Sequence, residues 1–453
     1  MPLLKFLATV AVVLLLFGNA PAARGAEPTF SGLSAEAPLG GPTIFHATVA
    51  AEAQPARIEA LLSVPGDRTV TVLAADVTAG TTAGTWSATA TFEGHVLANT
   101  PLSYRFRATD SDEVQHTSSA AQILVADTRF AWRSLNGPIV RLHWYSGDDA
   151  FAQRALDIGE KAISNASTLL GVTETEPIDF FIYDNSAPFR DALGPGTREN
   201  VAGRAVANIR TMYGLILPSQ VNEDWVDILV THELTHLVFD TATRNVYHFA
   251  PHWLNEGIAT YLSEGVSPRW ESAIRLGKAS NSLIPLQGMG ATFGAGDERF
   301  DLGYAEGVSA VDYFVKTYGE PMLWELVRSY AEGLSDDDAF TRATGADLPS
   351  FNSAWMESIG ATVPAEVGPQ PGPTGRPIGS SPAPPAGTGI ADQFAIVGLV
   401  ALVLIIGVGG VILLLRRNRR PPAPPAPPAP PPPPPEALGP PDISAPPRWE
   451  PGG

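Results

Sequence analysis

Two histidines and a glutamate within five residues are the most chemically informative feature of this sequence. The segment His232-Glu233-Leu234-Thr235-His236 lies in WVDILVTHELTHLVFD, whose apolar spacing predicts an amphipathic α-helix. Residues four apart share one helix face, so both imidazoles can bind one metal ion. Zinc (Zn²⁺) with N and O ligands and one open position lowers the pKa of a bound water to about 7. Glu233 can then act as general base while that water attacks a carbonyl.

The third ligand of such an ion must come from another segment. Ala242 and Phe239 occupy the positions at which a metzincin has its third His and its Gly, so that extension is absent. Downstream, Glu256 falls on a helix that is expected to begin near Trp253, and its carboxylate would complete a two-His, one-Glu set. His248 and His252 are rivals for this position. We predict that His232, His236 and Glu256 bind the metal.

Two further segments resemble a known family. WLNEGIATY resembles the W-L-N-E-G-x-A segment of gluzincin metallopeptidases of the aminopeptidase N type and of peptidase-MA-like domains. In that clan the Glu of this segment is the third zinc ligand, which implies this role for Glu256. GYAEGVSAV resembles the family's Y-x-K-G-A segment, which implies that Tyr304 stabilises the tetrahedral oxyanion. The resemblance covers about Leu229 to Gly319 and implies a thermolysin-like zincin fold.

One family motif is missing. The G-x-M-E-N segment of the exopeptidases does not occur upstream of the HExxH segment. The nearest upstream segment, Met212 to Pro218, is a candidate for the edge strand that pairs with a substrate backbone, and it contains no Glu to bind a free amino terminus. We therefore expect an endopeptidase. Thr260, one turn after Glu256, is either a hydrogen-bond partner of a ligand His or an ordinary helix residue.

Both ends of the chain predict a single-pass membrane protein. Residues 1–26 have the charge, apolar run and small residues of a signal peptide. Residues 394–415 carry no charge and can span a bilayer, and the basic residues that begin at Arg416 place residues 416–453 in the cytoplasm. This cytoplasmic tail is rich in proline and is expected to be a plain solvated tail, with binding to an aromatic-lined groove of a partner as the alternative. The folded part is expected outside the cell membrane.

The remaining residues divide into two domains and a stalk. Residues 29–127 alternate apolar and polar residues between turns, which predicts an all-β immunoglobulin/fibronectin III-like sandwich that acts as a spacer or adhesive module. Residues 132–361 predict an α+β catalytic domain, in which a few strands precede helices. One of those strands is expected at Val206–Leu217. Residues 363–393 are rich in Pro and Gly and predict a stalk.

The composition of the chain excludes several kinds of partner and active site. The net charge of -18 argues against nucleic acid as a partner, and the absence of cysteine excludes disulfides, thiolate metal sites and cysteine nucleophiles. We predict a membrane-anchored extracytoplasmic zinc metallopeptidase that hydrolyses a peptide or protein substrate through a zinc-activated water. The alternative is an inactive gluzincin-fold binding or adhesion protein at the cell surface. The intact Glu233 argues against that alternative, because a structural zinc site needs no general base. A hydrolase of non-peptide substrates also stays open.

Overall fold

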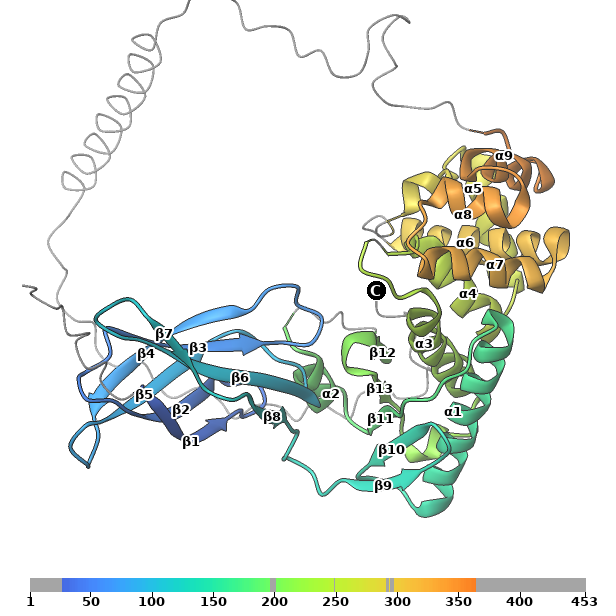
Figure 1. The fold of residues 1–453 in the computed structure, drawn as a ribbon. Helices are drawn as coiled ribbons and strands as arrows, with labels where there is room; N and C mark the ends of the chain where they lie inside the picture. Colours follow the sequence, from blue (N-terminus) through green and yellow to red (C-terminus); the bar gives the residue numbers. More distant parts are fainter. Residues whose placement is uncertain (1–26, 196–200, 248, 291–292, 294–296, 364–453) are drawn as a thin grey trace, which may run out of the picture. The chain divides into compact units, whose positions relative to one another are not determined.

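The computed structural model describes residues 27–195, 201–247, 249–290, 293 and 297–363 (Figure 1). The predicted signal peptide (1–26), transmembrane helix (394–415) and cytoplasmic tail (416–453) lie outside these residues, as does the predicted stalk after Val363. Among the described helices, none combines the length and the apolar character that a membrane crossing requires.

The N-terminal part of the chain forms two connected layers of antiparallel strands, which confirms the predicted β-sandwich. The first half of β4 pairs with β3 and its second half pairs with β5, so this strand joins the two layers. Side chains on β2 alternate between buried and half-buried positions, and Phe45 and Val49 point into the core. The strands are β1 (Thr29–Glu36), β2 (Thr43–Ala50), β3 (Arg57–Ser63), β4 (Thr71–Ala79), β5 (Thr85–Phe92), β6 (Thr100–Thr109), β7 (Gln115–Thr117) and β8 (Ala121–Val125).

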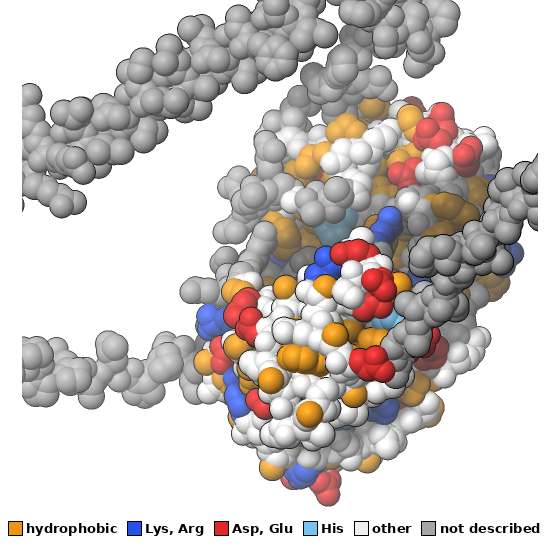
Figure 2. All heavy atoms as spheres, turned by 60° about the vertical axis from the view of Figure 1, so that its left-hand side comes forward, with side chains coloured by type: hydrophobic (Ala, Val, Ile, Leu, Met, Phe, Trp, Pro, Cys, Tyr) orange, Lys and Arg blue, Asp and Glu red, His pale blue; other side chains and the backbone are white. Residues whose placement is uncertain are grey.

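The sandwich core is small and partly aromatic. Phe45, Tyr104 and Phe106 are buried and contact one another at ring-centroid distances of 4.8 and 6.4 Å. Figure 2 shows that acidic and basic side chains are interspersed on the face turned to the viewer, with apolar side chains scattered among polar ones. Such a mixed, largely polar covering suits a surface in contact with water.

The sandwich also bonds directly to the sheet that follows it. Asn99, in the left-handed region at φ 59°, donates from Nδ2 to Asp179 Oδ2 at 3.1 Å and to Thr211 Oγ1 at 3.0 Å. The neighbouring Ala98 N–H donates to Ala192 O at 3.2 Å, and its carbonyl accepts from the Tyr213 hydroxyl. Because these partners belong to the C-terminal part of the fold, the sandwich is more than a separate spacer.

A five-stranded sheet supports the C-terminal part of the fold. Its strand order is β12-β13-β11-β10-β9, in which β10, β11 and β13 are parallel and the two outer strands are antiparallel. Helix α1 (Asp149–Leu170) begins after Asp148, whose side chain accepts from Phe151 N, and ends at Gly171 with φ 65°. The strands are β9 (Arg133–Asn136), β10 (Val140–Trp144), β11 (Ile178–Tyr183), β12 (Gly203–Val206) and β13 (Thr211–Leu215).

The prediction of one strand at Val206–Leu217 is wrong. The chain reverses there, and β12 and β13 pair as an antiparallel hairpin joined by a short 3₁₀ turn. β13 therefore lies inside the sheet and β12 forms its edge, so the segment Met212–Pro218 is not the edge strand that the sequence suggested. The reversal depends on Arg210, which has φ 48° and bonds to Glu174 and Thr241. These partners are distant in sequence, which is why no local turn signal marked the reversal.

Helices form the rest of the C-terminal part, and the sequence predicts most of their ends to within a few residues. α3 contacts α1, α4 and the edge strand β12. The apolar spacing of the sequence predicts a helix over Leu302–Tyr318, whereas α6 begins five residues earlier, at Asp297. The helices that follow α1 are α2 (Ser186–Leu193), α3 (Asp224–Thr243), α4 (His252–Ser263), α5 (Pro268–Ser280), α6 (Asp297–Tyr318), α7 (Glu320–Ala331), α8 (Asp336–Thr344) and α9 (Leu348–Ser358).

Helices α4 and α6 cross with their backbones in contact. A Cβ at Gly257 would lie 2.6 Å from Gly307 O, and a Cβ at Gly307 would lie 2.8 Å from Trp253 O. Only glycine leaves room for this approach, because the atoms that a side chain would meet belong to the backbone. The crossing fixes α4, which carries Glu256, against α6, which carries Tyr304.

Replacing Gly257 with Ala should therefore force the two helices apart. We expect the free energy of unfolding to fall by about 1–3 kcal/mol, as is typical when a close-packed contact is overfilled. Urea unfolding followed by circular dichroism measures this loss. Gly290→Ala is the control, because a Cβ there meets no atom within 4 Å. Equal stability of the two variants would show that the crossing tolerates a side chain.

Glu306 is a buried acid on α6, and it gives a pH-dependent prediction. Its Oε1 accepts from Ile284 N at 2.9 Å, and its buried Oε2 has no hydrogen-bond partner among the described residues. Burial raises the pKa of Glu306 to about 8 from 4.5. Between these values the folded chain keeps a proton that the unfolded chain releases, so this group's contribution to stability falls as the pH rises.

The variant Glu306→Gln removes this titration and keeps an acceptor for Ile284 N–H. We expect the loss of stability between pH 5 and pH 8 to be smaller in the variant than in the wild type. Urea midpoints at the two pH values test this directly. Parallel pH dependence in both proteins would mean that Glu306 is ionised in the folded chain.

Candidate metal centre

The HExxH segment lies in the middle of α3 and is buried on nearly every side. α3 packs against α1 on one side and against α4 on another, and β12 covers part of it. Its apolar residues Leu229, Leu234 and Leu237 belong to the main hydrophobic core, whereas His232 and Glu233 are fully buried polar side chains in the same helix. Buried polar side chains need hydrogen-bond or ion-pair partners, so we expect other polar side chains to lie beside this part of α3.

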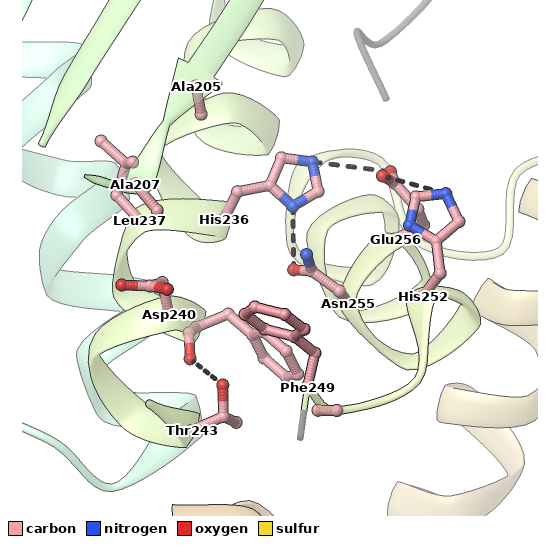
Figure 3. Close-up of a pocket in the computed structure, with 12 residues that line it drawn as sticks. Ala205, Ala207, His236, Leu237, Asp240, Thr243, Phe249, His252, Asn255 and Glu256 are labelled. Atoms are coloured by element: carbon pink, nitrogen blue, oxygen red, sulfur yellow. Dashed lines mark hydrogen bonds and ion pairs between the residues drawn. The ribbon is translucent and has the colours of Figure 1, made fainter. Parts of the chain in front are cut away.

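The structure brings together the three side chains that the sequence predicts as metal ligands. Glu256 Oε2 lies 3.2 Å from His232 Nε2 and 3.5 Å from His236 Nε2. One ligand atom from each of these three residues lies within 4.8 Å of the other two. Figure 3 shows His236 approaching the Glu256 carboxylate across the gap between α3 and α4.

The donor set fits zinc. Zinc–N and zinc–O bonds of about 2.0–2.2 Å in a tetrahedron place ligand atoms about 3.3 Å apart, which is close to the two distances observed. His236 Nε2 is buried and has no hydrogen-bond partner among the described residues, so it is an unused polar atom aimed at the shared point. Two imidazoles and a carboxylate leave the fourth position open, as in catalytic zinc sites.

The electrostatics of the cluster favour the metal-binding protonation state in His232 and Glu256 but not in His236. Burial lowers the pKa of His232, which keeps its imidazole neutral. Burial acts to raise the pKa of Glu256, but His236 and His232 outweigh it and hold this pKa below its usual range. A neutral imidazole beside an ionised carboxylate is the form in which these groups bind a metal. Burial acts to lower the pKa of His236, but Glu256 and Glu233 outweigh it and raise this pKa, so a bound cation would have to displace a proton there.

Glu233 is anchored to the edge strand. Its Oε2 accepts from Ala205 N at 2.7 Å, while its buried Oε1 has no hydrogen-bond partner among the described residues. A Cβ at Gly203 would lie 2.7 Å from Leu229 Cδ1 and 2.9 Å from Glu233 Cγ, so glycine lets β12 approach α3 this closely. Burial raises the pKa of Glu233 to about 7, which suits a group that must both take and release a proton.

Asn255 is a residue of the site to which the sequence gave no role. Its Oδ1 lies 2.9 Å from His236 Nδ1. An acceptor on Nδ1 places the ring proton there and leaves Nε2 as the lone-pair nitrogen that faces Glu256 and the metal position. The signal available in the sequence was its place in the WLNEG segment, directly before Glu256.

The other predicted site residues have different surroundings. The Tyr304 ring lies 6.1 Å from the His232 ring, but it is buried against Trp270 and Phe293 and does not line the pocket at the site. Thr260 Oγ1 is buried without a hydrogen-bond partner in the described part of the chain. Of the two rival ligands, His248 lies outside the described residues, and His252 lies beside Glu256.

A pocket of about 260 Å³ opens beside the cluster (Figure 3). Its lining comes from β12 and the turn after it, from the C-terminal half of α3, from the segment before α4 and from the start of α4. Phe249, a residue that is 81% exposed, is part of this lining. The lining residues are Ala205, Ala207, His236, Leu237, Phe239, Asp240, Thr243, Phe249, Ala250, His252, Asn255 and Glu256.

Asn255→Ala should weaken zinc binding by about 10- to 100-fold, the usual cost of losing a partner that orients a ligand. Asn255→Asp keeps an acceptor for His236 Nδ1–H and should retain most of the affinity. Competition with a chelator of known affinity measures both. If the Ala variant binds zinc as tightly as the wild type, the bond to His236 does not orient the ligand.

Comparison with known proteins places this site in a family. Residues 158–361 match the model of the Peptidase MA superfamily. No curated protein matches the chain. Solved structures include an M1 zinc metallopeptidase from Deinococcus radiodurans, at 14% identity over 76% of this chain and 95% of that one, with a TM-score of 0.34. Another is an aminopeptidase N family protein from Idiomarina loihiensis, at 10% identity over 71% of this chain and 69% of that one, with a TM-score of 0.28.

TM-scores this low do not decide the fold, so the assignment rests on the family match, which includes both the HExxH segment and Glu256. Residues 158–361 therefore form a gluzincin-like peptidase domain of the Peptidase MA superfamily.

Proposed function

We propose that this protein is a zinc metallopeptidase that hydrolyses peptide bonds. The observation that carries the proposal is the buried cluster of His232, His236 and Glu256, with Glu233 next to the first histidine in the chain. These three side chains would hold the zinc ion. When bound, zinc acts as a Lewis acid that activates a water and polarises the carbonyl under attack.

The protein's own residues supply the other parts of the reaction. Glu233 holds its carboxylate in place through Ala205 N and keeps Oε1 available as the oxygen that accepts a proton. Burial keeps its pKa near the working pH, so it can return this proton to the leaving amine. Tyr304 is the proposed donor to the oxyanion, a role that rests on the resemblance of its segment to the family motif.

The substrate is proposed to bind as an extended chain along β12. This strand is the edge of the sheet, and edge strands accept an added strand through their backbone groups. Its sequence, Gly203 to Val206, contains no acidic side chain. In the adjoining pocket the Asp240 carboxylate pairs with Arg244. Since an aminopeptidase must hold a free ammonium group, this arrangement supports the proposed endopeptidase character.

Membrane anchoring is a proposal that rests on the sequence. The uncharged run at 394–415 is followed by the basic residues from Arg416, and an apolar segment near the N-terminus resembles a signal peptide. In this arrangement the peptidase domain is outside the cell and meets extracytoplasmic peptides or proteins. The proline-rich residues 421–453 then face the cytoplasm and are proposed to remain solvated or to bind a partner there.

Glu233→Gln separates an enzyme from an inactive binding protein of the same fold. The amide still lies beside Ala205 N but cannot accept the proton of water, so we expect peptide-library cleavage to fall by about 10²- to 10⁴-fold. Zinc content should stay at one ion per chain. Glu271→Gln, an exposed change on α5, is the matched control. Bound zinc without cleavage in either the wild type or the variant would favour the binding protein.

A further inference from the structure

His252 is a third histidine at the metal centre, and neither motif gives it a role. It is the first residue of α4 and precedes Glu256 by four residues, so both side chains lie on one face of the helix. Its Nε2 lies 3.8 Å from Glu256 Oε1. The other carboxylate oxygen, Oε2, is the one that approaches His232 and His236. Figure 3 accordingly shows His236 and His252 on either side of the carboxylate.

The position of the His252 ring is well defined. The backbone N–H of His252 donates to Gly290 O at 2.9 Å, which ties the start of α4 to the segment before α6. Its ring lies 4.8 Å from the ring of Phe293. Only 19% of the side chain is exposed, on the side that lines the pocket. The imidazole therefore has little freedom to turn away from Glu256.

The two carboxylate oxygens of Glu256 have different neighbours. The residue is 2% exposed, so water cannot freely solvate either oxygen. Oε2 is the oxygen nearest His232 and His236, whereas Oε1 is the oxygen nearest His252. Carboxylates that bind a metal are usually hydrogen-bonded by a neighbouring group, which fixes their orientation. His252 is the side chain placed to do this, because its Nε2 is 3.8 Å from Oε1, a separation that a small shift would shorten to a hydrogen bond.

We propose that His252 is a positioning residue that holds Glu256 Oε1 through its Nε2–H group and so directs Oε2 to the zinc. This inference rests on the proposed zinc site. His252 is not itself a ligand in this arrangement, because the described atoms that lie within 4.8 Å of one another come from His232, His236 and Glu256. Because His252 and Glu256 are four residues apart on α4, the helix itself places the supporting imidazole beside the ligand carboxylate.

The test measures zinc affinity in the full chain, by competition with a chelator. His252→Leu should weaken zinc binding by about 10- to 100-fold. His252→Gln, whose amide can still donate to Oε1, should recover most of this loss. The visible spectrum of the Co²⁺-loaded protein should be the same in the wild type and in both variants, because the ligand atoms do not change. His46→Leu, in the sandwich, controls for the loss of a histidine elsewhere.

Three results would overturn the proposal. Unchanged zinc affinity in His252→Leu would mean that Glu256 needs no support from His252. An altered Co²⁺ spectrum in His252→Gln would make His252 a direct ligand. If His232→Ala leaves zinc affinity unchanged, the metal site itself is wrong, and the failure then belongs to the proposed function. A loss in His232→Ala with none in His252→Leu would remove the positioning role alone.

Discussion

The carboxylate of Glu256, buried between two imidazoles, is the constraint on which the C-terminal part of the fold depends. Removing an ionised group from water costs several kcal/mol unless partners replace the lost solvent. His232 and His236 come from α3 and Glu256 comes from α4, so these helices must pack face to face before any of the three groups has its partners. The glycine crossing at Gly257 and Gly307 then sets α6 directly against α4. The polar centre and the apolar packing around it therefore require one another.

The link between α3 and the edge strand ties the base to the proposed substrate site. Glu233 accepts from Ala205 N, and Gly203 leaves the space that this bond needs. A substrate paired with β12 would thus lie along the same strand that positions Glu233, the proposed general base. Any shift of β12 would move the substrate and the base together. This coupling gives a physical reason for a glycine at the start of a short edge strand, where glycine is otherwise unfavourable.

The N-terminal sandwich takes part in the same structure. Asn99 bonds to β11 and β13 through Asp179 and Thr211, and the carbonyl of Ala98 accepts from Tyr213. Tyr213 and Ala98 also share a hydrophobic cluster with Phe189 of α2. Ala98 and Asn99 are far in sequence from the predicted metal ligands. Their contacts nevertheless reach the sheet that contains β12. The sandwich therefore supports the sheet of the peptidase domain as well as occupying the N-terminal part of the chain.

The sequence by itself predicted the candidate metal ligands and most of the elements. The i, i+4 spacing of His232 and His236 defines a metal-binding face on any helix, and the segment around Glu256 resembles a family whose glutamate binds zinc. Periodicity predicted most strands of the sandwich, although not β1 or β7, and the helices from α3 to α9, because these elements bury a continuous stripe or an alternating face. Local patterns of this kind are independent of what the element packs against.

Only the tertiary structure decided the features that depend on distant partners. The hairpin of β12 and β13 has no local turn signal, since Arg210 is held in its left-handed conformation by Glu174 and Thr241. The bond from Asn255 to His236, the link from Ala205 to Glu233, and the approach of His252 to Glu256 all concern side-chain direction, which residue spacing restricts but does not fix. Sequence spacing thus predicted the metal ligands, whereas packing determined how each of these side chains is held.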